Sequence, residues 1–533
     1  MIVVFRWLMI LALLVPLGLS TVSAAESDDE DGLFWWNDRV FYEIFVRSFY
    51  DSTGDGIGDL QGIIEKMDYL QELGIGGIWL MPISPSPSYH GYDVIDYRDI
   101  NPDYGTMEDF RALLEAAEAH DIAIIIDLVV NHSSVQHPWF IASADDPDGE
   151  FGDWYIWEEE DPGFRGPDNQ VVWHQRGGRY YYGVFWGGMP DLNYRNPDVT
   201  AEMHDIARFW LEDVGVAGFR LDAIKHIIIE GRNQENTPAT RAWLTDFRAF
   251  VNDVNPDALL VGEVWSSSIM AAPYTGTGVD IVFEFDLADA IIRAASFGVA
   301  STLVNQMNTI LSLYPDQQYA TFITNHDQNR VMSQLRGDFQ AAKVAANILL
   351  TLPGVPFVYY GEEIGMTGTK PDPEIRTPMQ WDGDLPNVGF TTGTPWSAIN
   401  DDWADGVTVA VQDADPDSLL NHYREMIALR NATPALRRGS YVPVTSGAGT
   451  VFSFLRDADE QTVLVVLNLR DREIDNYGLT LAADSLPEGA TLRLIYGEVD
   501  EAIAQPDLAD GGFEDYKPVE TLPPMAVLIF EIE

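Results

Sequence analysis

The chain of 533 residues contains no cysteine and few basic residues. Without cysteine it can form no disulfide bond, no thiolate metal site and no cysteine nucleophile. Lysine and arginine number 31 against 84 aspartates and glutamates, only five of the 31 are lysines, and the formal net charge is -53. Such a field repels phosphate backbones and anionic membranes. We therefore expect no nucleic-acid partner, and no membrane partner once an N-terminal signal is removed.

The acidic composition itself has two interpretations. A solvated acidic surface keeps a secreted protein soluble, whereas adaptation to high salt uses ions to screen the self-repulsion of the charges. The scarcity of lysine favours the second interpretation, but composition alone leaves both open.

Long hydrophobic runs are also scarce, with one exception near the N-terminus. The run WLMILALLVPLGL follows Arg6 and precedes the small residues TVSAA. This is the pattern of a secretory signal peptide, which we place at residues 1–25 with cleavage after Ala24 or Ala25. The run is shorter than the roughly 20 residues of a membrane-spanning helix. The sequence thus predicts a secreted protein, extracellular or periplasmic, and we expect it to be a monomer.

Eight short apolar segments follow, separated by segments with helical periodicity such as MEDFRALLEAAEAH. Apolar runs bounded by polar loops are typical of strands that are buried on both faces. Strands and helices that alternate eight times predict an α/β fold, the (β/α)8 or TIM barrel. The predicted strands are 41–46, 75–83, 122–130, 217–222, 259–264, 281–285, 320–327 and 355–363.

Two regions depart from this alternation. Residues 131–200, after the third strand, are rich in Trp, Tyr, Gly and Pro, and a connection this long indicates an inserted subdomain. From about residue 437 the pattern becomes that of alternating strands, which predicts an antiparallel β-sandwich. We assign residues 26–436 to the barrel with its insert, and 437–533 to the sandwich.

Four of the apolar runs end at an acidic residue: Asp127, Asp222, Glu263 and Asp327. In a barrel of parallel strands the C-terminal ends converge at one rim, where catalytic groups gather. A single aspartate at a strand end is more often a helix cap than a catalyst. Four such endings in these residue sets are improbable as caps alone, so we expect an acid/base site.

Cleavage of a glycosidic bond requires two carboxyl groups in different protonation states. Arg220 and Asp222 point to the same side of their strand, and a guanidinium beside a carboxylate keeps it ionised, as a nucleophile requires. Glu263 lies between Gly262 and the apolar Val264, and apolar surroundings raise a carboxyl pKa, as a proton donor requires. Asp327 could stabilise positive charge on the sugar ring.

These segments resemble the characteristic regions of glycoside hydrolase family 13, the α-amylase family. DLVVNH (127–132), GFRLDAIKH (218–226), GEVW (262–265) and TNHD (324–327) are similar to its four regions, and MPDLN (189–193) to a fifth. The MPDLN form is similar to an intermediate group between oligo-1,6-glucosidases and neopullulanase-like enzymes. The resemblance implies a TIM barrel that acts on α-glucans.

The resemblance also implies a role for each matching residue. Asp222 matches the nucleophile, Glu263 the general acid/base and Asp327 the acid that stabilises the transition state. Asp127 is better interpreted as structural. The positions that match substrate-binding residues are Tyr92, His132, Arg220, Lys225, His226, His326 and Arg330.

The activity within the family is less defined. LDAxKH at the nucleophile resembles α-amylases, whereas DSTGDGIGDLQGI (51–63) and RTPMQWD (376–382) resemble oligo-1,6-glucosidases and α-glucosidases. We expect an endo-acting α-amylase that cleaves α-1,4 bonds of starch-type glucans with retention. The alternatives are an α-glucosidase or oligo-1,6-glucosidase, a cyclomaltodextrinase or glucanotransferase, and a non-catalytic binding homologue, which the intact carboxylates disfavour.

The predicted cofactor is structural calcium, at two places. Asp51, Thr53, Asp55, Ile57 and Asp59 alternate with glycines, and this spacing is similar to the first half of a calcium loop, with Ile57 contributing its carbonyl. Family relatives usually have Asn where this chain has Thr53. A second site of many α-amylases matches Asn131, Asp191 and the carbonyl of His226.

Overall fold

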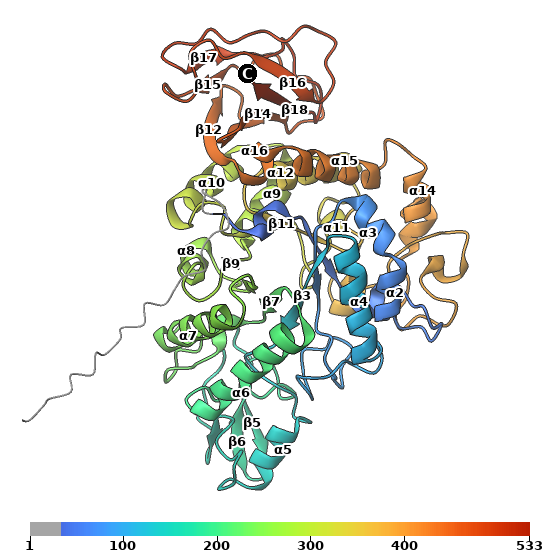
Figure 1. The fold of residues 1–533 in the computed structure, drawn as a ribbon, viewed down its shortest axis with the longest axis vertical. Coiled ribbons are helices and arrows are strands. Elements are labelled where there is room, and N and C mark those ends of the chain that lie inside the picture. The colour runs from blue at the N-terminus through green and yellow to red at the C-terminus, as the bar shows by residue number, and fades with distance from the viewer. Residues whose placement is uncertain (1–32) are drawn as a thin grey trace, which may run out of the picture.

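The computed structural model describes residues 33–533, in which eight parallel strands form a barrel (Figure 1). The strand order is β10-β11-β1-β2-β3-β7-β8-β9, and the circle closes where Glu284 N donates to Ala320 O at 3.0 Å. Each predicted segment contains one strand, so the barrel prediction is confirmed. The strands are β1 Phe41–Ile44, β2 Gly77–Leu80, β3 Ala123–Leu128, β7 Gly218–Leu221, β8 Leu259–Gly262, β9 Ile281–Val282, β10 Ala320–Thr321 and β11 Val355–Tyr359.

Large apolar side chains fill the inside of the barrel. Phe41, Trp79, Val261 and Phe357 are almost fully buried there, because alternate residues of each parallel strand point inward. The inside is therefore a packed core, and polar groups can meet only at its ends.

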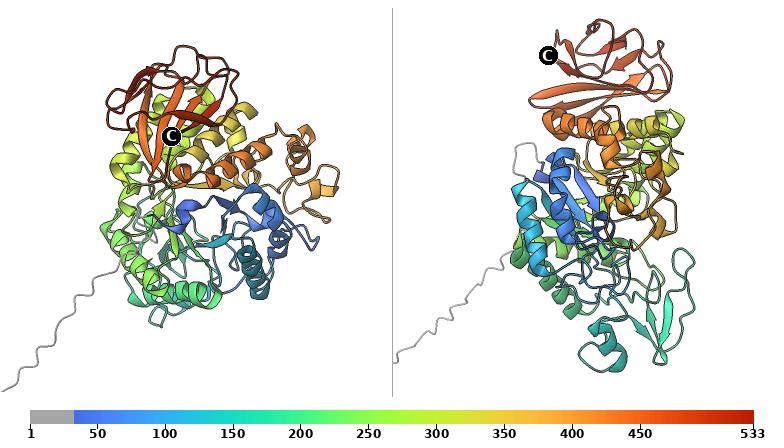
Figure 2. Two further views of the ribbon diagram at one scale, coloured as in Figure 1. Left: turned by 45° about the horizontal axis from the view of Figure 1, so that its top comes forward. Right: turned by 90° about the vertical axis from the view of Figure 1, so that its right-hand side faces the viewer.

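Helices surround the barrel between successive strands (Figures 1 and 2). Their starts follow local rules: Thr106 and Asp109 form a capping box at α4, and Thr237 caps α7 ahead of Pro238. The longer helices are α2 Leu60–Glu65, α3 Met67–Leu73, α4 Met107–Ala119, α6 Pro197–Arg208, α7 Pro238–Val254, α9 Phe285–Phe297, α10 Ser301–Leu313, α12 Phe339–Thr351 and α15 Leu419–Ala432. Short helices are α1 Val46–Phe49, α8 Ser268–Ala271, α11 Val331–Gln334, α13 Asp372–Ile375, α14 Val409–Asp413 and α16 Pro434–Arg438. Single turns and a π-helical segment are η1 Trp35–Asp38, η2 Phe209–Val214, η3 Ile224–His226, η4 Ala272–Tyr274, η5 Pro386–Gly389 and η6 Asp401–Asp405.

The segment between β3 and α6 forms a small subdomain of its own. It holds α5 (Pro138–Asp145) and a three-stranded antiparallel sheet in the order β4-β6-β5 (Trp157–Glu158, Arg179–Tyr182 and Trp173–Arg176). Trp173 and Tyr182 belong to its buried core, whereas Phe185 and Trp186 are 41% and 51% exposed. Some aromatic side chains of the insert therefore form its core, and others are accessible to a ligand.

The C-terminal strands form a seven-stranded antiparallel sheet with its own apolar core. Its strand order is β16-β18-β14-β13-β12-β15-β17, and it lies at the opposite end of the molecule from the insert (Figures 1 and 2). This agrees with the predicted β-sandwich. Its strands are β12 Ser440–Ser446, β13 Val451–Ala458, β14 Gln461–Asn468, β15 Leu479–Leu481, β16 Leu492–Tyr496, β17 Phe513–Tyr516 and β18 Val527–Ile532.

The predicted signal peptide (1–25) falls within residues 1–32, outside the described part of the chain. Among residues 33–533, no helix combines the length and apolar character that crossing a bilayer would need.

Candidate active site

The predicted catalytic acids meet at one rim of the barrel. Asp222 follows β7, Glu263 follows β8 and Asp327 lies beyond β10, and all three line one open pocket of about 670 Å³. Other predicted residues that line this pocket are Tyr92, His132, Lys225 and His226. The structure thus gathers these predicted residues from five barrel connections into one cleft.

A single buried guanidinium joins the acids. Arg220 Nη1 donates to Asp127 Oδ2 at 2.7 Å and to Asp222 Oδ1 at 2.8 Å, and Nη2 donates to Glu263 Oε2 at 2.8 Å. The Arg220 side chain is fully buried. Because β3, β7 and β8 are neighbours in the sheet, their C-terminal residues can share one cation.

This sharing changes the expected electrostatics. Burial raises the pKa of Asp222 well above its ordinary value; Arg220 opposes the rise, and the nearby charges of Glu263 and Asp127 add to it. Burial also raises the pKa of Asp127 to about 6, against the opposing effect of Arg220. The sequence predicted that Arg220 keeps Asp222 ionised. In the structure Arg220 alone is not enough to do so. Three carboxylates around one cation favour the retention of a proton among them.

The residue after the nucleophile has a strained backbone. Ala223 has φ = +52°, in the left-handed region that costs a non-glycine residue about 1 kcal/mol or more. In this conformation its N–H donates to Glu263 Oε2 at 3.0 Å. The turn after β7 therefore orients the acid of the neighbouring strand.

Asp327 is held by two cations. His326 Nε2 lies 3.1 Å from Asp327 Oδ2, and Arg376 Nη2 donates to Oδ1 at 2.7 Å. Burial alone would raise the pKa of Asp327, but His326 and Arg376 outweigh it and hold the pKa well below its ordinary value. Asp327 is thus a permanent negative charge facing the cleft.

Two neighbouring acids stabilise the protonated form of His326. Its Nδ1 lies 2.5 Å from Oε1 of Glu43, a residue of β1. Burial alone would lower the pKa of His326, but Asp327 and Glu43 raise it to about 9. The imidazolium can therefore donate on both sides at neutral pH.

Tyr92 connects these two groups of charges. Its hydroxyl donates to Asp127 Oδ2 at 3.1 Å and lies 2.7 Å from His326 Nε2, and its ring stacks on the imidazole at 5.6 Å between centroids. Fixed in this way, the ring forms part of the wall of the cleft, as the resemblance implies for a sugar-stacking residue.

The remaining predicted substrate residues differ in how they are placed. Burial lowers the pKa of His132 to about 3, so its ring is neutral, and its buried Nε2 has no hydrogen-bond partner among the described residues. Lys225 Nζ lies 3.0 Å from Glu235 Oε2 and donates to Trp265 O at 3.0 Å. His226 Nδ1 lies 3.0 Å from Gln234 O.

Three of the predicted substrate residues do not line the cleft. Arg220 and His326 are fully buried but contact Asp222 and Asp327. The third is Arg330. It is 1% exposed, it is absent from the pocket lining, and its guanidinium packs over the rings of Tyr359 and Tyr360. Its Nη1 donates to the Tyr360 carbonyl at 2.6 Å. These contacts give Arg330 a structural role behind the barrel rim.

Other cleft residues were missed by the sequence reasoning. Arg376 and Asp372 line the pocket, together with Trp265, which is 47% exposed and stacks on Phe285 at 5.0 Å. The motif RTPMQWD begins with Arg376, so the resemblance contained a signal for it. Glu43 gave no signal beyond an acid inside the apolar segment FYEIFV.

The first candidate metal site is a loop that hydrogen-bonds to itself. Asp51 accepts from the backbone of Gly54 and Gly56 at 2.7 Å, and Asp59 accepts from Gly62 N at 2.6 Å. Within residues 33–533 no group of three or more His, Asp or Glu side chains is arranged to hold a metal ion. A cation there would depend on hydroxyl and carbonyl oxygens such as those of Thr53 and Ile57.

The second candidate metal site contains an unpaired oxygen. Asn131 Oδ1 is buried and has no hydrogen-bond partner in the described part of the chain. It lies near Asp191, which is 2% exposed and accepts from Val184 N at 3.0 Å. An amide oxygen beside a buried carboxylate is a donor set that suits a hard cation.

Comparisons with known proteins identify the family of the chain. The sequence profile of the alpha amylase catalytic domain matches residues 43–439. Alpha-amylase 3 of Dictyoglomus thermophilum is 40% identical over 440 residues, covering 82% of this chain and 85% of that protein. An oligo-1,6-glucosidase of Heyndrickxia coagulans is 34% identical over 535 residues, covering 84% and 95%.

Two further relatives are named for amylase or trehalose synthase activity. The trehalose synthase/amylase TreS of Mycolicibacterium smegmatis is 36% identical over 493 residues, covering 80% of this chain and 81% of that protein. The crystal structure of an alpha-amylase from H. orenii has a TM-score of 0.77 and 41% identity, covering 93% of this chain and 99% of that one. The profile spans most of the chain, and these relatives cover four fifths or more of it, so this chain belongs to glycoside hydrolase family 13, the α-amylase family, whose members act on α-glucans.

Proposed function

We propose that the protein is an endo-acting α-amylase that hydrolyses α-1,4 bonds with retention. The observation that carries this proposal is the guanidinium of Arg220, which bridges Asp222 and Glu263 at 2.8 Å each. Two carboxyl groups that share one guanidinium lie close together, as the two carboxyl groups of retaining enzymes do. In inverting enzymes the two groups lie farther apart, because a water molecule must fit between one of them and the sugar.

The reaction then proceeds in two displacements. Asp222 attacks the anomeric carbon while Glu263 gives its proton to the leaving glycosidic oxygen, so the C–O bond breaks as an ester to Asp222 forms. Glu263, now ionised, takes a proton from water, and the resulting hydroxide displaces Asp222. Asp327 stabilises the positive charge of the ring in both transition states.

Two exposed tryptophans of the cleft support a polymer substrate. Trp186 and Trp265 line the pocket and are 51% and 47% exposed, so their faces can stack on glucose units beyond the one that is cleaved. An exo-acting α-glucosidase is the second candidate, because Arg376 of the glucosidase-like motif RTPMQWD also lines the cleft.

Digestion of soluble starch tests this proposal. We expect a ladder of maltodextrins from the start of the reaction, whereas glucose alone would identify the exo-acting candidate. The Asp222→Asn variant should lose about 10⁴-fold or more of kcat with an unchanged melting curve. An unchanged rate in this variant would eliminate the proposed nucleophile.

We also propose that calcium binds and that the protein is secreted. At the second candidate site Asn131 Oδ1, Asp191 and the carbonyl of His226 would hold the ion, and the 51–59 loop would hold another through Thr53 and Ile57. Calcium would tie the inserted subdomain to the barrel. N-terminal sequencing of protein recovered from culture medium, with a start at residue 25 or 26, tests secretion.

A further inference from the structure

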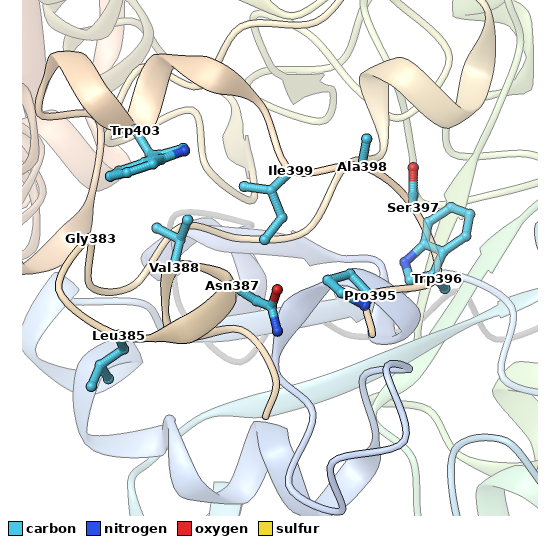
Figure 3. A pocket seen from close by; sticks show the side chains of 10 residues that line it. All are labelled: Gly383, Leu385, Asn387, Val388, Pro395, Trp396, Ser397, Ala398, Ile399 and Trp403. Atoms are coloured by element: carbon cyan, nitrogen blue, oxygen red, sulfur yellow. The ribbon is translucent and has the colours of Figure 1, made fainter. Parts of the chain in front are cut away.

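A second pocket lies outside the catalytic cleft, on the long connection after β11. It encloses about 480 Å³ and is lined by residues of the segment 383–403 alone, among them Trp403, Leu385 and Ile399 (Figure 3). This volume is within the range of small-ligand sites. The mechanism uses none of these residues, so the pocket requires its own explanation.

The lining has a composition that selects neutral ligands. In a protein with a net charge of -53, its ten residues include no charged side chain. Trp403 in η6 is 38% exposed, and Leu385 is 53% exposed at the rim. Gly383 lies under the indole, where an added Cβ would be 3.3 Å from Cε3, so one ring face rests on the backbone. A neutral ligand with flat apolar faces fits such a surface.

A fixed polar group complements the indole. Asn387 Nδ2 donates to the carbonyls of Thr391 at 3.0 Å and Gly393 at 2.7 Å, which turns the amide oxygen toward Ile399 across the pocket (Figure 3). A carboxamide held in this way offers an acceptor for a hydroxyl group.

The backbone is strained to present these groups. Asn387 has φ = +49° and Val388 has φ = +56°, and both line the pocket. A β-branched residue in the left-handed region is an outlier, and such strain persists where the surrounding structure or a function maintains it.

A row of contacting aromatic rings lies between the pocket and the catalytic cleft. Trp396, at the edge of the pocket, stacks on Tyr89 at 5.4 Å, and Tyr89 contacts His90 edge-on at 5.4 Å. His90 lines the cleft. These rings mark a route along which a chain of sugar rings can run from the cleft toward the pocket.

We propose that this pocket is an accessory binding site for an α-glucan chain. A glucose unit stacks on the Trp403 indole through its apolar face and donates a hydroxyl hydrogen bond to Asn387 Oδ1. The identity of the ligand rests on the proposed function, because the occupant is taken to be the polymer held in the cleft.

The test separates binding from catalysis. Binding of soluble starch is measured by affinity electrophoresis in an Asp222→Asn background, with and without Trp403→Ala. We expect Trp403→Ala to weaken binding about ten-fold, equivalent to ~1.4 kcal/mol. Leu385→Asp, which adds a charge at an exposed rim position, should weaken binding in the same direction without disturbing a core. Phe297→Ala removes a 60% exposed ring on α9 and serves as the control with no effect.

Kinetics with wild-type Asp222 complete the test. Trp403→Ala should raise KM for starch with kcat unchanged, and should leave hydrolysis of maltotriose as it is. Equal starch affinity with and without Trp403, or an equal loss in Phe297→Ala, would overturn the inference. A protein that binds starch through Trp403 but cleaves no α-glucan would retain the accessory site and overturn the proposed function.

Discussion

Replacement of Glu43 by glutamine isolates the role of a charge behind the catalytic site. Glu43 Oε1 lies 2.5 Å from His326 Nδ1, and both side chains are at most 2% exposed. Glutamine keeps an acceptor of similar shape but removes the negative charge. The variant therefore changes electrostatics at His326 with little change in packing.

The magnitude follows from the pKa of His326. Its elevation to about 9 from an ordinary 6.5 corresponds to ~3.4 kcal/mol of preferential stabilisation of the charged ring. Burial opposes this elevation, and Asp327 at 3.1 Å shares it with Glu43. Because the acids also overcome the effect of burial, half of the net elevation is a lower bound for the share of Glu43. The pKa should therefore fall by at least about one pH unit, and unfolding should become easier by ~1.5–2 kcal/mol or more.

The sign of the pH dependence is fixed. A raised pKa contributes stability that is complete below about pH 6.5 and is lost as the pH rises through about 9. The stability difference between wild type and Glu43→Gln should therefore be largest at acidic pH and vanish above about pH 9. The alkaline limb of kcat/KM should move to lower pH, because His326 must stay charged beside Asp327.

Urea unfolding across this pH range and NMR titration of the histidine signals measure both effects. The chain has nine histidines, so a His326→Gln variant identifies the signal. Glu118→Gln, at an exposed position on α4, is the control for loss of one negative charge. A stability difference that persists above about pH 9, or a His326 midpoint that does not move, would refute the reasoning.

Three further predictions follow from the charges of the site and the surface. Arg376→Gln removes the 2.7 Å contact with Asp327, so the depressed Asp327 pKa should rise, the acid limb of the pH profile should move to higher pH, and kcat/KM should fall about 10- to 100-fold; an unmoved acid limb would contradict this assignment. Chelation with EDTA should lower the melting temperature, readdition of calcium should restore it, and a melting curve indifferent to both would exclude structural calcium. Added KCl should raise the melting temperature by screening the net charge of -53, and a flat response between low and molar salt would argue against self-repulsion as a large cost.

The barrel and the catalytic acids could be predicted because each leaves a local trace in the sequence. A strand buried on both faces is a short apolar run, and an acid at its end stands out against that run, as at Asp222 and Glu263. Convergence of the strand ends then places the acids together without knowledge of any distance.

Groups that act through contacts distant in sequence could not be predicted in this way. Glu43 and His326 are 283 residues apart, and nothing near Glu43 indicates its partner. The protonation of Asp222 depends on how many acids share Arg220, which is a property of the order of β3, β7 and β8 in the sheet. The pocket at Trp403 depends on left-handed backbone conformations at Asn387 and Val388, and the residue types at these positions do not predict such conformations.

The charge inventory of the cleft accounts for the division of roles among its acids. Five buried or partly buried acids face three cations. Ion pairs join Glu43, Asp127, Asp222, Glu263 and Asp327 to Arg220, His326 and Arg376. Asp372 also contacts Arg376, but it is paired with Lys370 and so adds no net charge. With every group ionised the cluster has two excess negative charges, and the one proton that the proposed mechanism places on its general acid reduces this to one.

In the transition state the sugar ring becomes positive while Glu263 gives its proton to the leaving oxygen, so the total charge of cluster and substrate does not change. The excess negative charge of the cluster then faces the positive ring and stabilises it. Salt screens the exposed surface charge but reaches these buried pairs weakly. Stability and catalysis should therefore respond differently to salt: melting should shift with ionic strength, whereas kcat on a short substrate should stay nearly constant. The kcat is measured at a temperature where the protein remains folded at every salt concentration. If kcat then changes with salt in the same way as the melting temperature, the surface charges influence the catalytic step, and the buried cluster alone does not determine the charge at the site.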